Sequence, residues 1–141
     1  RPHIEIRFAP SNQVHATKDR ASHAFLILNH GPVPAKKVTL HIRTHHRGTT
    51  VHEDRGHELG HMSAKEQSLY RVHVHDTDLA RIEGSDQPLK EDFAVQYRTS
   101  NVLRFWCDQV FTYSARFLFV ASENRWIWDP DAKVSETEEC L

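Results

Sequence analysis

Residues 21–43, ASHAFLILNHGPVPAKKVTLHIR, contain two apolar segments separated by a turn. In the first segment, residues 24–28, apolar side chains occupy consecutive positions, which is typical of a central strand in a sheet covered on both faces. One glycine and two prolines follow within residues 31–34 and indicate a turn. Residues 38–43 then alternate apolar and polar side chains, as a strand with one buried face does. This stretch predicts two strands joined by a turn.

The same two-residue period recurs along most of the chain. It predicts further strands at 4–8, 70–75, 93–97, 102–113, 115–121 and 125–128, with a hairpin turn near residues 113–115. Residues 45–58 are polar and contain glycine, so we expect a loop or a ragged edge there. No long amphipathic helix is evident. The pattern predicts an all-β fold, an antiparallel immunoglobulin-like β-sandwich of about seven to eight strands.

The length of 141 residues fits one domain. We expect the sandwich to occupy residues 1–128 and the acidic residues 129–141 to form a loosely ordered tail. The chain begins at Arg1 rather than Met, and we expect it to be a segment of a longer protein. Two cysteines, Cys107 and Cys140, do not indicate a disulfide framework.

Charge is distributed unevenly. The net charge is −1, but residues 1–75 carry a balance of +5 and all 12 histidines, whereas residues 76–141 carry −6. A chain with no overall positive charge and no basic–aromatic pattern gives no sign of nucleic-acid binding. No apolar run approaches the length of about 18 residues that a membrane helix needs, so we expect no direct membrane insertion by this segment.

Residues 57–61, His-Glu-Leu-Gly-His, match the zinc-protease pattern H-E-x-x-H. On a helix, His57 and His61 would lie on one face and bind zinc, and Glu58 would act as general base. Gly56 and Gly60 disfavour a helix, however, and few apolar side chains are available to bury one. In so histidine-rich a chain, about 0.07 matches are expected by chance alone.

A third zinc ligand has no clear candidate. The metzincin extension needs histidine at position 67, where this chain has Gln67. Glu66, His73, His75 and Glu83 are available, but none has a family spacing. We therefore interpret the match as fortuitous, expect a turn at residues 55–66, and assign no catalytic, cofactor-binding or metal-binding residue.

Two other groups of residues suggest binding. His73 and His75 share one strand face, and an earlier strand carries His41 and Arg43; with these, the further histidines at 45, 46, 52 and 57 could form a metal site. Aromatic side chains gather near the C-terminus, at positions 105, 106, 111, 113, 117, 119, 126 and 128. An aromatic-rich core explains them, and a partner surface or ligand cleft is the alternative.

Residues 21–43 resemble the second and third strands of bacterial immunoglobulin-like domains of the CARDB type. The matching positions are Asn29, Gly31, Pro32, Pro34, Ala35 and Val38. Residues 59–74 are similar to the next stretch of that family, with Lys65 in place of its usual turn glycine, and residues 93–106 are similar to paired strands in the extramembrane domains of anchored bacterial proteins. The resemblance implies a noncatalytic sandwich serving adhesion, spacing or recognition, with residues 57–61 before a strand.

The functional prediction is therefore a non-enzymatic interaction or accessory module of a larger protein, with no cofactor. Its expected partner is another protein or a neighbouring domain of the same polypeptide, and a homodimer through edge strands is an open alternative. Its compartment is not defined by the sequence, and an extramembrane position in a membrane-anchored protein is compatible with the resemblance. The alternatives are a small zinc metallopeptidase using His57, Glu58 and His61, and a histidine-rich metal- or ligand-sensing β domain.

Overall fold

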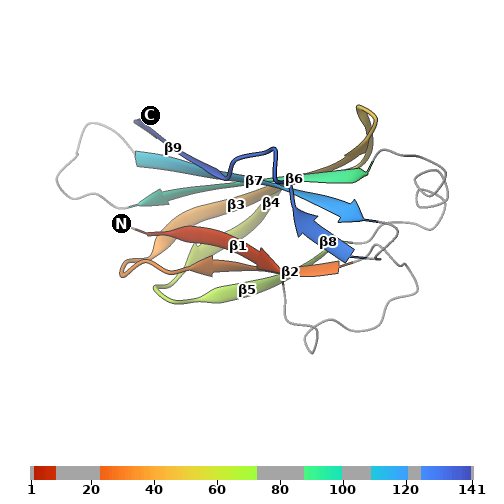
Figure 1. Cartoon of the computed structure of the whole chain (residues 1–141). Coiled ribbons are helices and arrows are strands. Elements are labelled where there is room, and N and C mark those ends of the chain that lie inside the picture. Colours follow the sequence, from red (N-terminus) through yellow and green to blue (C-terminus); the bar gives the residue numbers. More distant parts are fainter. Residues whose placement is uncertain (1, 9–22, 73–87, 100–108, 121–124, 141) are drawn as a thin grey trace.

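A computed structural model of the chain describes residues 2–8, 23–72, 88–99, 109–120 and 125–140 (Figure 1). Within these ranges all regular structure is β-strand. The strands are β1 (Ile4–Phe8), β2 (His23–Asn29), β3 (Ala35–His46), β4 (Thr49–Met62), β5 (Gln67–Val72), β6 (Leu89–Thr99), β7 (Gln109–Val120), β8 (Arg125–Trp128) and β9 (Ser135–Cys140). In this part of the chain, no helix is long and apolar enough to cross a membrane.

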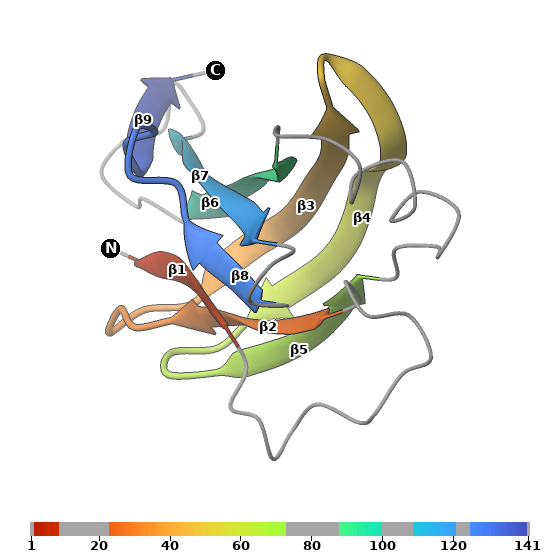
Figure 2. The same ribbon diagram turned by 45° about the vertical axis from the view of Figure 1, so that its right-hand side comes forward.

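The strands form two antiparallel sheets that face each other (Figure 2). The smaller sheet has the order β1-β2-β5, so β2 is its central strand, as the continuous apolar run predicted. The larger sheet has the order β4-β3-β6-β7-β8, and β9 also pairs with β7. The predicted all-β fold, an antiparallel β-sandwich, is confirmed.

Alternating side chains of both sheets build the core between them. The predicted inward positions 38, 40 and 42 of β3 and 93, 95 and 97 of β6 are all buried. Phe25 of the smaller sheet packs edge-on against Phe93 of the larger sheet, with ring centroids 4.3 Å apart. Phe117 of β7 also packs edge-to-face with Phe93, with ring centroids 5.1 Å apart. Aromatic packing of this geometry stabilises beyond the area it buries.

The side chain of Asn29, at the end of β2, connects three segments of the chain. Its Nδ2 group donates hydrogen bonds to the backbone carbonyls of Val33 at 2.9 Å and Ser63 at 3.2 Å. A longer contact of 3.4 Å reaches the carbonyl of Met62. The side chain therefore ties the β2–β3 turn to the end of β4.

The Asn29 side chain also accepts two hydrogen bonds. Its Oδ1 atom receives the backbone N–H of His3 at 3.1 Å and that of Gly31 at 3.0 Å. Its backbone N–H donates to the carbonyl of Glu66, and its carbonyl accepts from the N–H of Lys65. Asn29 is 1% exposed. Without its side chain, the backbone groups that it bonds would have neither a protein partner nor water to bond to.

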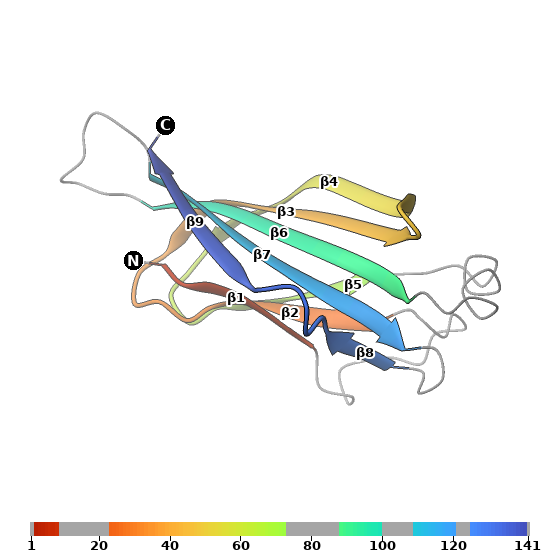
Figure 3. The same cartoon turned by 45° about the horizontal axis from the view of Figure 1, so that its top comes forward.

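The structure differs from several sequence expectations about strand boundaries. Of the loop or ragged edge expected at residues 45–58, the structure has the ragged edge: β3 continues to His46, and β4 begins at Thr49 as an edge strand with several register shifts against β3. No hairpin forms at residues 113–115, because β7 runs as one strand from Gln109 to Val120. Residues 135–140 of the expected loose tail form β9, whose backbone pairs with residues 109–114 of β7 (Figure 3).

The β3–β4 hairpin closes with a two-residue turn at Arg47 and Gly48. Their φ angles are 52° and 78°, so both residues adopt the left-handed conformation. Turns with positive φ at both central positions match the twist of the flanking strands and favour Asn-Gly. Gly48 suits this geometry, whereas Arg47 adopts it at a cost in free energy.

Replacing Asn29 with alanine is expected to lower the free energy of unfolding by about 3 kcal/mol or more, because several buried backbone groups lose their partners. The measurement is urea unfolding followed by circular dichroism. The exposed polar Gln96 provides a control, since Gln96→Ala should change stability by less than about 0.5 kcal/mol. Equal effects of the two substitutions would contradict the structural role of Asn29.

Replacing Arg47 with asparagine should raise the free energy of unfolding by about 1 kcal/mol, because asparagine tolerates the left-handed conformation. Arg47→Ala is the matched control, since it removes the arginine side chain without supplying the turn preference. Thermal unfolding of both variants measures the difference. A melting temperature that falls equally in both would argue against strain at this turn.

Candidate functional site

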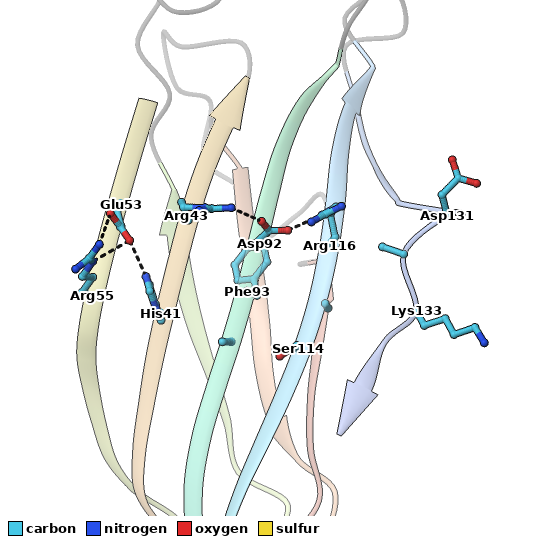
Figure 4. A pocket seen from close by; sticks show the side chains of 13 residues that line it. His41, Arg43, Glu53, Arg55, Asp92, Phe93, Ser114, Arg116, Asp131 and Lys133 are labelled. Carbon is cyan, nitrogen blue, oxygen red and sulfur yellow. Dashed lines mark hydrogen bonds and ion pairs between the residues drawn. The ribbon is translucent and has the colours of Figure 1, made fainter. Parts of the chain in front are cut away.

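The outer face of the larger sheet carries a row of alternating charges. In the strand register, Arg43 of β3 lies opposite Glu53 of β4 and Asp92 of β6, and Asp92 lies opposite Arg116 of β7. Opposite charges at cross-strand positions attract, and their side chains are close enough to pair. The register of four strands therefore produces a ladder of charges, Glu53–Arg43–Asp92–Arg116 (Figure 4).

Asp92 is the centre of this ladder. Its Oδ1 atom accepts a hydrogen bond from Nε of Arg116 at 2.6 Å. Its Oδ2 atom lies 2.9 Å from Nε2 of His45 and 3.4 Å from Nη2 of Arg43. Partial burial by itself would raise the pKa of Asp92, but the hydrogen bond and charge of Arg116 and the neighbouring His45 outweigh it and hold that pKa below its ordinary value.

A second ion-paired group lies on β3 and β4. Glu53 contacts Nε of Arg55 at 2.8 Å and Nε2 of His41 at 3.0 Å. The hydrogen bond from Arg55 and then that from His41 lower the pKa of Glu53. Both carboxylates of the ladder, Glu53 and Asp92, are thus stabilised in their charged forms.

Next to the ladder, the sheet surface is hollow. Two residues after Asp92 on β6 lies Ala94, and it is paired with Ser114 of β7 in the strand register. Their small side chains leave a hollow of about 590 Å³. Its walls are the charged side chains on one side and residues 131–133, which connect β8 to β9, on the other (Figure 4). The hollow has the size of a ligand pocket and a strongly polar rim.

The H-E-x-x-H residues lie in a strand. Residues 57–61 belong to β4, which contradicts the expected turn at residues 55–66; the turn begins only after Met62. In an extended strand, the Cα atoms of His57 and His61 are roughly 13 Å apart, far more than one helical turn allows. Gly56 and Gly60 have φ angles of 66° and 73°, which break the regular strand.

His57 packs against an aromatic ring instead. Its imidazole meets the ring of Tyr70 on β5 edge-on, with centroids 5.0 Å apart. The Tyr70 hydroxyl donates a hydrogen bond to Asp54 of β4. Burial, and then the Asp54 carboxylate, raise the pKa of Tyr70. His57 and its strand therefore help to join the edges of the two sheets, and Met62 at the end of the same strand is buried in the core.

The predicted histidine cluster is assembled only in part. Two of its members, His41 and His45, reach carboxylates beside the hollow. Among the residues that the structure describes, no three histidine, cysteine, aspartate or glutamate side chains are grouped closely enough to hold a metal ion. His73, His75, Glu83, Phe105, Trp106 and Cys107 lie outside the described residues.

Sequence reasoning identified His41, Arg43 and His45 but missed the other side chains of the site. Asp92 and Arg116 occupy outward positions of strands whose inward positions were recognised. Their charges gave a signal for solvent exposure, but not for proximity to one another. Ala94 and Ser114 carried no signal at all, because a small residue forms a hollow only beside taller neighbours.

Substituting Asp92 with asparagine should lower the free energy of unfolding at pH 7 by about 1–3 kcal/mol, because charge-assisted hydrogen bonds are lost and two arginines remain close together. The pKa of Asp92 is depressed in the folded state, so its contribution is present at neutral pH and is lost as the pH falls below about 4.

Urea unfolding of the wild type and Asp92→Asn between pH 7 and the acid limit of folding tests this. The difference between them should shrink as the pH falls below about 4. Asp131→Asn, a change at an exposed carboxylate on the opposite wall, is the control. A difference that stays constant with pH would show that Asp92 stabilises the fold without its charge.

Comparison with known proteins identifies no relative. No protein-family model matches the chain, and neither the curated proteins nor the solved structures contain a match. Any functional conclusion therefore rests on the sequence and on the geometry of the described residues.

Proposed function

We propose that this chain is a non-enzymatic interaction module with an immunoglobulin-like sandwich. The strand order supports the fold family: the first, second and fifth strands form one sheet, and the fourth, third, sixth and seventh follow one another in the other. Immunoglobulin-like domains pair their strands in this Greek-key arrangement. The resemblance of residues 21–43 to CARDB-type domains is consistent with it.

The observation that carries the proposal is the hollow beside the charge ladder, with Ala94 and Ser114 at its floor. A neighbouring domain or a partner protein would place a protruding side chain in the hollow and match the surrounding charges. Charged rims give specificity and speed association, whereas the floor of the hollow would supply the contact that becomes buried on binding.

The electrostatics favour binding over catalysis. A general acid or base works best with a pKa near the working pH. The pKa values of Asp92 and Glu53 are shifted in the opposite direction, because arginine and histidine side chains hold both groups in their charged forms. The zinc-peptidase alternative is less well supported, since it requires a helix where β4 lies.

Blocking the hollow tests the proposal. Peptides are first selected from a random library displayed on phage by binding to the wild-type chain, and their affinities are then measured by calorimetry. Ala94→Trp should weaken binding about tenfold or more, because the indole fills the space that a partner side chain needs. Gln96→Trp is the matched control, since it adds the same side chain to the same face of β6 outside the hollow.

Thermal unfolding verifies that both variants fold. Retained affinity in Ala94→Trp, or equal losses in the two variants, would mean that the hollow is not the binding surface. A chain that selects no peptide above the background of an unrelated domain would argue against a peptide-binding module.

A further inference from the structure

A second cleft lies at the opposite edge of the sandwich. It separates β1 of the smaller sheet from β8 and β9 of the larger sheet and has a volume of about 420 Å³. Figure 2 shows β1 beside β8, with the chain continuing from β8 into β9. The cleft shares no lining residue with the hollow at Ala94, so it is a separate site.

Exposed apolar side chains gather at this cleft. Among the residues that the structure describes, three large apolar side chains are exposed: Leu69 at 41%, Trp128 at 41% and Val134 at 51%. Trp128 and Val134 both line the cleft. An exposed apolar patch with a polar rim is a common mark of a binding site. One of the aromatic side chains that gather near the C-terminus, Trp128, is therefore exposed at the surface.

The aromatic walls of the cleft are held in place. The indole of Trp128 packs on the ring of Phe117, with centroids 4.3 Å apart. Tyr113 is 6% exposed, and this burial raises the pKa of its hydroxyl above the ordinary value. Rigid aromatic groups lose little conformational freedom when a ligand binds.

The rim of the cleft is acidic. Its lining contains the carboxylates of Glu5 and Glu136, the imidazole of His3, and no lysine or arginine. Glu5 is paired with Arg7 and contacts the ring of His30, so its charge is partly compensated. Glu136 accepts a hydrogen bond from the Tyr97 hydroxyl at 2.5 Å, which fixes its carboxylate beside the aromatic walls.

We propose that this cleft binds a lysine or arginine side chain of a basic segment in a partner protein. The face of an indole ring attracts a cation, and a nearby carboxylate strengthens that attraction. The aliphatic part of the same side chain would cover Val134 while its charged head remains near Glu136. An acidic ligand would be repelled by the rim, and a purely apolar ligand would gain nothing from the negative charge of the two carboxylates. The proposal does not depend on the hollow at Ala94.

The test uses the complete chain and two blocked peptides, acetyl-Gly-Gly-Arg-Gly-Gly-amide and the same peptide with citrulline in place of arginine. Citrulline has the shape of arginine without its charge. Titration is followed by ¹H–¹⁵N NMR, including the indole signal of Trp128. The arginine peptide should shift that signal and the amides of β9 saturably, at least about fivefold more tightly than the citrulline peptide.

Three variants locate the site. Trp128→Leu and Glu136→Gln should each weaken binding of the arginine peptide about threefold or more. The glutamine retains an acceptor for the Tyr97 hydroxyl, so the local structure is preserved. Glu139→Gln removes an exposed charge from the opposite face of β9 and should leave the affinity unchanged. Equal binding of the two peptides, or equal weakening by Glu136→Gln and Glu139→Gln, would overturn the proposal.

Discussion

The burial of one amide side chain, Asn29, constrains the arrangement of both sheets. It lies where β2 ends, and its five hydrogen bonds reach the chain before β1, the β2–β3 turn and the end of β4. Each group bonded to the Asn29 side chain is part of the backbone. These hydrogen bonds therefore fix where the backbone segments run relative to one another, and not how side chains pack. An amide suits this place because it donates and accepts at once. A carboxylate would repel the three carbonyls.

The two candidate sites lie on surfaces of the larger sheet that the smaller sheet does not cover. On the outer face of the larger sheet, charged side chains pair across strands, and a hollow remains where Ala94 and Ser114 are neighbours. At the edge opposite β4, β8 and β9 extend the larger sheet beyond the smaller one. Trp128 and Val134 are exposed there, since they have no full layer of side chains above them.

The main errors of sequence reasoning concern edge strands. The polar side chains and glycines of β4 predict a loop, a turn or a ragged edge, and the structure has an irregular edge strand. An edge strand needs only one paired neighbour, and irregular, charged edges are a common defence against unwanted pairing. The acidic residues of β9 predict a loose tail for the same reason. Its acidic side chains bury little, and its order comes from backbone pairing with β7.

The sequence by itself determined the class of fold, because alternating apolar side chains allow only a sheet with one buried face, and it determined the central position of β2. It also disfavoured a helix at residues 57–61, through Gly56 and Gly60. Only the tertiary structure decided which residues form the candidate sites. Asp92 and Arg116 meet through strand register, and Trp128 and Glu136 come to line one cleft because β8 and β9 both pair with β7. Such distances depend on how distant segments align, which no local pattern encodes.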